Sequence, residues 1–251
     1  MRNLHLVIIC ISILIVSVSG CIDNDEKEKE EVYILEAVIS VNKNVVWIVY
    51  PDEKSETITF DASSSKGDIV EYKWDFGDNE TGEGVLVTHR YTQADTYQVK
   101  LKITDTNGKD NLKQLNFVYV NYKAEYEGNI TKDEKEKSYF FPLKGSAKSA
   151  TITLQYSSNY VDHPSPIPDK PNTNNLDLYI YYNASDDSEV KNSSTPLDTK
   201  ATGTIKEVVE LSRNDLLYNL TGMRASVKWA DDCPPSDNPI DYTLLIEVYY
   251  N

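Results

Sequence analysis

Cysteine and histidine are scarce in this chain, which has three of each in 251 residues. Cys10 and Cys21 lie in the N-terminal segment, so Cys233 is the one cysteine of the remainder. A single cysteine forms neither an intrachain disulfide nor a cysteine metal cluster, and the aspartates before Cys233 do not favour a reactive thiolate. His89 and His163 are far apart in sequence, which does not indicate a histidine-based zinc site.

The sequence also lacks the motifs of common enzyme classes. It has no Gly-x-Ser-x-Gly nucleophile turn, no glycine-rich phosphate loop and no dinucleotide-binding fingerprint. The sequence does not exclude a Ser-His-Asp triad, because the three residues of such a triad can be far apart in sequence and still meet in the fold. The formal net charge of −15 disfavours nucleic acid, whose binding needs clustered Lys and Arg. We therefore predict a protein that is not an enzyme and does not bind nucleic acid.

The N-terminus indicates export and membrane attachment. An apolar run over residues 4–18 is followed by Ser19, Gly20 and Cys21, which is typical of a secretory signal peptide over residues 1–20. The segment before the cysteine resembles a lipobox, which implies cleavage before Cys21 and lipidation of its side chain. The alternative is an uncleaved signal anchor. Residues 23–31 are nearly all charged and predict a solvated tether over residues 21–32. The expected location is therefore the extracellular face of the membrane.

Alternating apolar and polar residues dominate the segment from residue 69 to residue 105. Four residues are expected on one face of the first strand: Val70, Tyr72, Trp74 and Phe76. Four more are expected on one face of a later strand: Tyr97, Val99, Leu101 and Ile103. A period of two over this length is typical of half-buried β-strands.

This segment resembles the PKD domain, an immunoglobulin-like β-sandwich. The matching motifs are Phe60-Asp61-Ala62-Ser63, Trp74-Asp75-Phe76-Gly77-Asp78, His89-x-Tyr91 and Gly108 after Asp105. The resemblance covers about residues 38–121 and implies a spacer or binding module, and it places the first domain at residues 33–121. It also implies a structural role for His89.

The second half, residues 122–251, predicts another β-sandwich. Short alternating runs lie at residues 138–143, 150–156, 176–182, 203–210, 225–229 and 242–250, and residues 215–220 have room for one helical turn. This half resembles the bacterial pre-peptidase C-terminal domain, through Tyr139-Phe140-Phe141, Asn175-Leu176-Asp177-Leu178-Tyr179 and Tyr242-Thr243-Leu244. The resemblance implies a jelly-roll-like fold. A long proline-rich loop at residues 157–174 departs from that family. The fold class is therefore all-β, with two sandwiches in series.

Calcium is the one ion that the sequence makes worth considering. Asp75, Asp78 and Asn79 cluster in a turn, Asp61 and Asp68 are expected at another edge of the same sandwich, and the loop from Asn183 to Glu189 is a further candidate. Calcium prefers such oxygen ligands. Asp and Asn also fix turns by bonding backbone amides. We favour this second interpretation and expect no metal or other cofactor.

Exposed aromatic residues and glycosylation sequons are the remaining surface signals. Tyr179, Tyr181 and Tyr249 fall opposite the core residues of their strands and are candidate contacts for a carbohydrate or a protein. The alternative is that both faces of these strands are covered. Five Asn-x-Ser/Thr sequons predict surface positions and candidate glycosylation, at Asn79, Asn129, Asn183, Asn192 and Asn219.

These observations predict a lipid-anchored surface protein of archaeal type that spaces or binds. Its partner is expected to be a cell-surface protein or a polysaccharide, and the membrane is reached through the N-terminal lipid. One alternative is an accessory subunit of an exported protease or transporter complex. Another is a hydrolase with an unrecognised site in the second sandwich.

Overall fold

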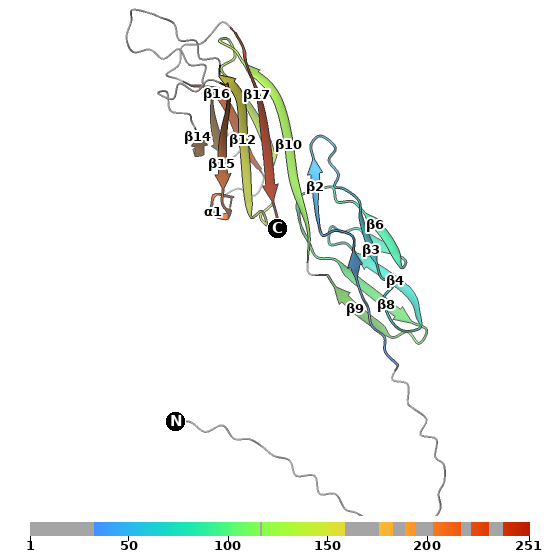
Figure 1. Cartoon of the computed structure of the whole chain (residues 1–251). Helices are drawn as coiled ribbons and strands as arrows, with labels where there is room; N and C mark the ends of the chain where they lie inside the picture. Colours follow the sequence, from blue (N-terminus) through green and yellow to red (C-terminus); the bar gives the residue numbers. More distant parts are fainter. Residues whose placement is uncertain are drawn as a thin grey trace, which may run out of the picture. The chain divides into compact units, whose positions relative to one another are not determined.

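The computed structural model describes residues 33–115, 117–158, 176–182, 189–193, 203–216, 222–230 and 238–251. All strands lie in one compact unit, Ile34–Asn251 (Figure 1). The predicted all-β fold is confirmed, and the helix assigned within these ranges is the single turn α1 (Arg213–Leu216). None of the helices in the described ranges has the length and apolar character that a membrane crossing requires.

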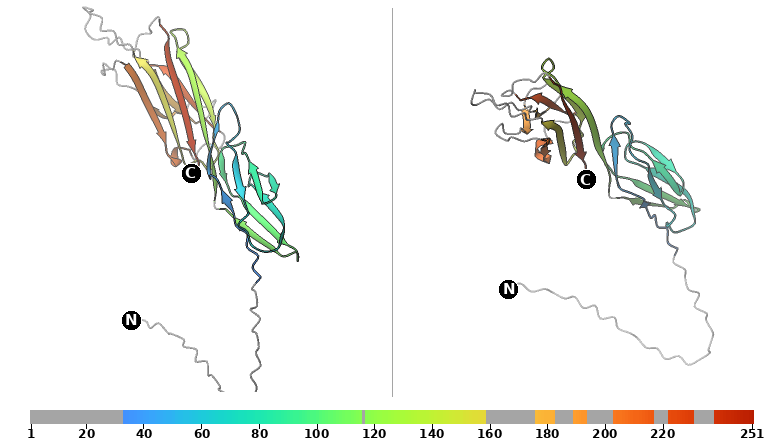
Figure 2. Two further views of the ribbon diagram at one scale, coloured as in Figure 1. Left: turned by 45° about the vertical axis from the view of Figure 1, so that its right-hand side comes forward. Right: turned by 45° about the horizontal axis from the view of Figure 1, so that its top comes forward.

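Two antiparallel sheets build the first sandwich. One has the strand order β5-β4-β8-β9, formed by β4 (Ile69–Asp75), β5 (Thr81–Glu83), β8 (Lys100–Asp105) and β9 (Asp110–Gln114). The other has the order β1-β3-β6, formed by β1 (Ser40–Val41), β3 (Ile58–Asp61) and β6 (Leu86–His89). Figure 2 shows these strands from two further directions.

Aromatic side chains fill the core between these sheets. Trp74 is fully buried, its ring centroid lies 5.8 Å from that of Phe60, and its indole N–H donates a 2.9 Å hydrogen bond to the Gly84 carbonyl. The residues predicted for one face of β8 and the segment before it are all buried: Tyr97, Val99, Leu101 and Ile103. The alternating pattern therefore located this core correctly.

The expectation for Val70 was wrong. Its side chain is 64% exposed, although strict alternation placed it beside Trp74. The pairing between β4 and β8 shifts register between Ile69 and Glu71. A β-bulge of this kind inserts an extra residue and turns its side chain away from the alternating pattern, so Val70 leaves the core face.

The strand β10 (Val118–Ile130) belongs to both halves of the chain. It pairs in parallel with β2 (Val45–Val49) and antiparallel with β7 (Asp95–Tyr97), which come from the first half. It also pairs antiparallel with β17 (Ile240–Tyr249) at the end of the chain. The predicted domain boundary between residues 121 and 122 falls inside this strand, and the division into domains stays a prediction.

The second half forms an eight-stranded sandwich. One sheet has the order β15-β12-β17-β10 and the other the order β11-β16-β13-β14, which is the strand arrangement of a jelly roll. The remaining strands are β11 (Glu136–Pro142), β12 (Ser149–Ser158), β13 (Leu176–Tyr181), β14 (Glu189–Ser193), β15 (Gly203–Leu211) and β16 (Gly222–Trp229). Each alternating run predicted from the sequence coincides with one of these strands.

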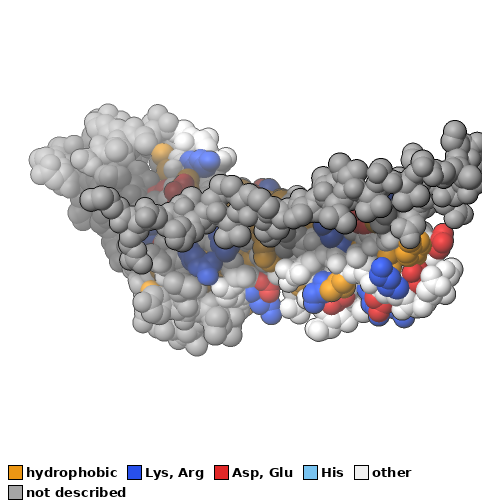
Figure 3. Space-filling view, turned by 90° about the horizontal axis from the view of Figure 1, so that it is seen from below, with side chains coloured by type: hydrophobic (Ala, Val, Ile, Leu, Met, Phe, Trp, Pro, Cys, Tyr) orange, Lys and Arg blue, Asp and Glu red, His pale blue; other side chains and the backbone are white. Residues whose placement is uncertain are grey.

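Charged side chains of both signs are interspersed on the described face shown in Figure 3. On the sheet that contains β4 and β8, Lys73 pairs with Glu71 at 2.6 Å and Lys102 pairs with Asp110 at 2.7 Å. These groups are largely exposed, so each pair adds little to stability. These pairs show that lysines locally offset the negative charge on the sheet that contains β4 and β8.

Candidate functional site

A cavity of about 810 Å³ lies where segments from both halves of the chain meet at β10. Three tyrosines line it, and we therefore call it the tyrosine cavity. Its lining comes from five segments: Ile48 in β2 with Tyr50 and Asp52 to Lys54 in the loop after it, Thr92 to Ala94 before β7, Tyr122 in β10, Phe140 and Pro142 in β11 with Leu143 and Lys144 after it, and Tyr250 after β17. Cavities of this size are typical of small-molecule and cofactor sites.

Hydrogen bonds at both ends hold the loop that carries Tyr50. Directly after β2, the Asp52 N–H donates to the Val49 carbonyl at 2.9 Å, which closes a tight turn. The loop ends at Ser55, which is buried and exchanges hydrogen bonds with Tyr91: its N–H donates to the Tyr91 carbonyl at 2.8 Å, and its hydroxyl accepts from the Tyr91 N–H at 2.9 Å. The loop is therefore fixed at both ends.

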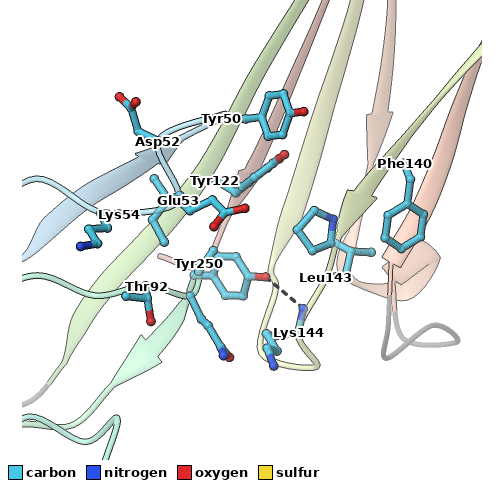
Figure 4. A pocket seen from close by; sticks show the side chains of 14 residues that line it. Tyr50, Asp52, Glu53, Lys54, Thr92, Tyr122, Phe140, Leu143, Lys144 and Tyr250 are labelled. Carbon is cyan, nitrogen blue, oxygen red and sulfur yellow. Dashed lines mark hydrogen bonds between the residues drawn. The ribbon is translucent and has the colours of Figure 1, made fainter. Parts of the chain in front are cut away.

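The aromatic rings of the tyrosine cavity differ in exposure. Tyr50 and Phe140 are each 47% exposed, and Figure 4 shows them on different sides of the cavity. Tyr122 and Tyr250 are buried, and the Tyr250 hydroxyl accepts a 3.0 Å hydrogen bond from the Lys144 N–H. The cavity thus combines two solvent-accessible rings with two fixed ones.

Burial keeps the two inner tyrosines neutral. Desolvation raises the pKa of Tyr250 to about 12, with a further contribution from Asp95. Desolvation also raises the pKa of Tyr122 above its ordinary value, with Tyr126 and Tyr50 adding to the effect. At neutral pH both side chains are phenols that can donate or accept hydrogen bonds, and neither is a phenolate that could act as a base.

The turn residues considered for calcium are engaged in local hydrogen bonds. Asp75 Oδ1 accepts from the Gly77 N–H, and Asp78 Oδ1 accepts from the Glu80 N–H, each at 3.0 Å. These are the turn-forming bonds that the sequence predicts for Asp. Asp61 makes the same kind of bond with the Ser63 N–H at 2.7 Å. Across the described ranges, no three Asp, Glu, His or Cys side chains are grouped so that they could hold a metal ion.

His89 lies in the first sandwich, away from the tyrosine cavity. Its Nε2 is 2.7 Å from Asp78 Oδ2, its ring stacks on Phe76 at 4.1 Å, and it meets the edge of Tyr91 at 4.6 Å. The side chain is buried. It therefore ties the turn to the core, as expected from the structural role that the resemblance implied.

The three tyrosines predicted to form a binding surface are not brought together. Tyr179 and Tyr181 lie in β13 and Tyr249 lies in β17, and these strands belong to different sheets. Tyr181 is also buried, because the Arg224 guanidinium packs 4.3 Å from its ring centroid and Tyr179 stacks beside it at 6.4 Å. Tyr249 is half-buried and meets the edge of Trp47 at 5.4 Å. The prediction of one tyrosine-bearing sheet was wrong.

Three of the predicted sequon asparagines are described and exposed: Asn79, Asn129 and Asn192. Asn183, Asn219 and the proposed lipidation site Cys21 lie outside the described residues. The tyrosine cavity was not predicted from the sequence, because its lining residues come from five separate segments. The proline after Tyr50 marked a turn there, but no local pattern pointed to a shared site.

Residues 49–120 match the family model described as the PKD domain. The chain contains a PKD domain. The resemblance stated from the sequence is thereby confirmed for the first sandwich. The resemblance of the second sandwich to the pre-peptidase C-terminal domain stays a prediction.

Two bacterial collagenases are similar to parts of the chain. Collagenase ColA of Clostridium perfringens is 36% identical over 91 residues, which cover 34% of this chain and 8% of that protein. Collagenase ColA of Bacillus cereus is 26% identical over 164 residues, which cover 64% of this chain and 16% of that protein. The second alignment is longer than the 121 residues that precede the second sandwich, so it extends beyond the PKD domain. The chain spans 16% or less of the length of either relative. These bacterial relatives lend no support to an archaeal source, which stays a prediction.

Two solved structures are also similar to it. The PKD1 domain from Vibrio cholerae metalloprotease PrtV is 28% identical, with 35% of this chain and 98% of that chain covered and a TM-score of 0.28. A carbohydrate-binding module of the β-sandwich superfamily is 17% identical, with 85% of this chain and 96% of that chain covered and a TM-score of 0.33. TM-scores this low add nothing to the fold described above.

Proposed function

We propose that this chain is a non-catalytic binding protein of the cell surface, held by a lipid on Cys21 and binding its ligand in the tyrosine cavity. The observation that carries the proposal is the pair of half-exposed rings, Tyr50 and Phe140, on different sides of a cavity of about 810 Å³. Rings that are accessible to solvent and carried by a strand or by a loop fixed at both ends offer flat apolar faces at low entropic cost.

The charges around the cavity favour a neutral ligand. Asp52 and Glu53 are balanced by Lys54 and Lys144, so the lining has no formal net charge. The whole chain is strongly acidic, which repels polyanions. A neutral glycan fits this combination, because a sugar ring presents an apolar face to an aromatic ring and hydroxyl groups to the surrounding polar side chains.

The test is affinity electrophoresis of the full-length protein in detergent, with a neutral glucan or an anionic polysaccharide in the gel. We expect retardation by the neutral polymer alone. Tyr50→Ala and Phe140→Ala should each weaken binding by about thirtyfold, since an aromatic contact at the centre of a site is worth about 2 kcal/mol.

Phe117→Ala is the matched control, because Phe117 is 42% exposed and does not line the cavity. It should bind like the parent. If all three variants bind equally, the tyrosine cavity is not the ligand site.

The similarity to segments of two collagenases favours a second candidate, an accessory role beside an exported protease. The chain would then bind the polypeptide substrate or the protease itself instead of a glycan. Co-purification of a protease with the full-length protein from its own membrane, lost in Tyr50→Ala but kept in Phe117→Ala, would support this candidate.

A further inference from the structure

The two flanks of β10 are occupied to different extents. On one flank, β7 pairs with residues 118–120 and β17 continues along residues 122–130, so that partners follow β10 almost from end to end. On the other flank, β2 pairs with residues 119–123 and then turns away at Tyr50. Nothing in the described part of the chain pairs with residues 124–130 on this flank, which we call the free lane.

The backbone of β10 presents hydrogen-bonding groups to the free lane. The Lys123 carbonyl accepts from the Tyr50 N–H at 2.8 Å on the β2 flank, so the odd-numbered residues of β10 direct their N–H and C=O groups to that side. Beyond Lys123 these residues are Glu125, Glu127 and Asn129, and all three side chains are exposed. A strand edge with such groups is a template for another strand.

The free lane has two chemically different faces. Glu125 and Glu127 lie on the outer face of the sheet. Tyr126 lies on the opposite face, where its ring is 4.4 Å from Tyr139 and 5.6 Å from Tyr50. A strand in the lane would place alternate side chains against two carboxylates and against a group of tyrosine rings.

The carboxylates of Glu125 and Glu127 also determine which kind of strand can pair with the free lane. Two copies of this chain that paired edge to edge in antiparallel fashion would bring Glu125 and Glu127 of one copy against those of the other, and like charges directly opposite are destabilising. A strand with Lys or Arg at the facing positions gains from the same carboxylates.

We propose that the free lane of β10 binds an extended segment of a partner protein in which basic residues alternate with apolar or aromatic ones. The segment adds a strand beside residues 125–129 and continues the position that β2 occupies next to residues 119–123. Main-chain hydrogen bonds would supply affinity, and the two faces of the lane would supply specificity. Tyr50 borders both this site and the tyrosine cavity, but residues 125–129 do not line that cavity, and the proposal does not depend on a ligand there.

The probe is a synthetic peptide of about eight residues that alternates lysine and valine, with a peptide that alternates glutamate and valine as its control. Hydrogen exchange of the full-length protein in detergent is followed at the amides of Glu125, Glu127 and Asn129. We expect fast exchange without peptide, protection with the lysine peptide and no change with the glutamate peptide. Protection of these amides in the protein alone would overturn the proposal, because the lane would then be filled already.

Two variants separate backbone pairing from simple charge attraction. Glu127→Pro removes an N–H that faces the lane together with one carboxylate and leaves the pairing with β17 in place. It is therefore compared with Glu127→Gln, which removes the carboxylate alone, and it should bind the lysine peptide about tenfold or more weakly than Glu127→Gln. The double variant Glu125→Lys, Glu127→Lys should reverse the preference to the glutamate peptide. The matched control is Glu83→Lys, an exposed glutamate of β5, which should bind like the parent.

Phe140→Ala, which alters the tyrosine cavity, should bind the lysine peptide normally. The proposal for the free lane and the proposal for the tyrosine cavity can therefore be refuted separately. Parent-like peptide binding by Glu127→Pro would overturn the proposal. Self-association of the protein that is lost in Glu127→Pro, without any peptide binding, would overturn it in favour of a second copy as the occupant.

Discussion

Replacing Trp74 with alanine should unfold or strongly destabilise the first sandwich. The side chain is 1% exposed, packs on Phe60 and donates its indole N–H to the Gly84 carbonyl. Truncation of a buried aromatic residue costs about 3–5 kcal/mol through lost burial and the cavity that remains. Small domains have a total stability of about 5–15 kcal/mol, so this single change removes a large share of it.

The second sandwich should survive this change, because the pairing of β10 with β17 extends over residues 122–130, whereas Trp74 lies in β4, which belongs to another sheet. Hydrogen exchange with mass spectrometry should therefore show lost protection in β4 and β8 and retained protection in β12, β15 and β16. In calorimetry, the midpoint temperature (Tm) of the first sandwich should fall by about 12 °C or more, because each kcal/mol of lost stability lowers the Tm of a domain of this size by about 4–8 °C.

Val70→Ala is the matched control on the same strand. Val70 is 64% exposed at the β-bulge, so this variant should change the free energy of unfolding by less than about 0.5 kcal/mol. The reasoning is refuted if Val70→Ala costs as much as Trp74→Ala, because the register of β4 would then follow strict alternation. A change of less than about 1 kcal/mol for Trp74→Ala would also refute it.

Two further predictions concern pH and the anchor. Burial raises the pKa of Tyr250 to about 12, above the ordinary value of 10.0, so the folded protein holds this proton more tightly than the unfolded chain. The protonated Tyr250 therefore stabilises the fold fully below pH 10, and this contribution is lost between pH 10 and 12. The free energy of unfolding from urea titrations should fall above pH 10, by about 1.4 kcal/mol per pH unit for each such tyrosine, and a free energy that is constant to pH 12 would contradict this. Mass spectrometry of the protein purified from membranes should find Cys21 as a lipid-bearing N-terminus, and Cys21→Ser should appear with an unlipidated N-terminus; a mature chain that starts at Met1 would refute the lipid anchor.

The strands of this protein were predictable because most of them follow a period of two. In β17 every second residue from Ile240 to Val248 is buried, and the sequence alone shows that alternation. The exception at Val70 arises from a bulge, which is set by the pairing of β4 with β8 and leaves no mark in the pattern of β4 itself. Local patterns thus give the faces of strands but not their partners.

The binding surfaces were not predictable for the same reason. Tyr179 and Tyr249 look equivalent in sequence because both lie opposite core residues, and only the strand order reveals that they belong to different sheets. The tyrosine cavity depends on the meeting of Tyr50, Phe140 and Tyr250, which are far apart along the chain. The free lane depends on where β2 ends relative to β10, which is a property of the sheet and not of either strand.

Asn121 links the core of the sheet to the tyrosine cavity, so its loss should weaken a site that it does not line. The side chain is buried at the point where β10 passes from the first half to the second. Its Oδ1 accepts the Tyr250 N–H at 2.8 Å, and its amide donates to Asn251 Oδ1 at 3.1 Å. Asn121→Ala leaves the Tyr250 N–H without this acceptor, at a cost of about 1–3 kcal/mol.

Because the Tyr250 hydroxyl also receives the Lys144 N–H, a shift of Tyr250 should move the cavity wall around Lys144. We therefore expect Asn121→Ala to lower both the stability and the retardation by neutral glucan. Asn251→Ala removes only the exposed partner and should lower neither by much. If Asn121→Ala lowers stability but binds glucan like the parent, Tyr250 is held in place by packing alone, and the proposed coupling between β10 and the cavity is wrong.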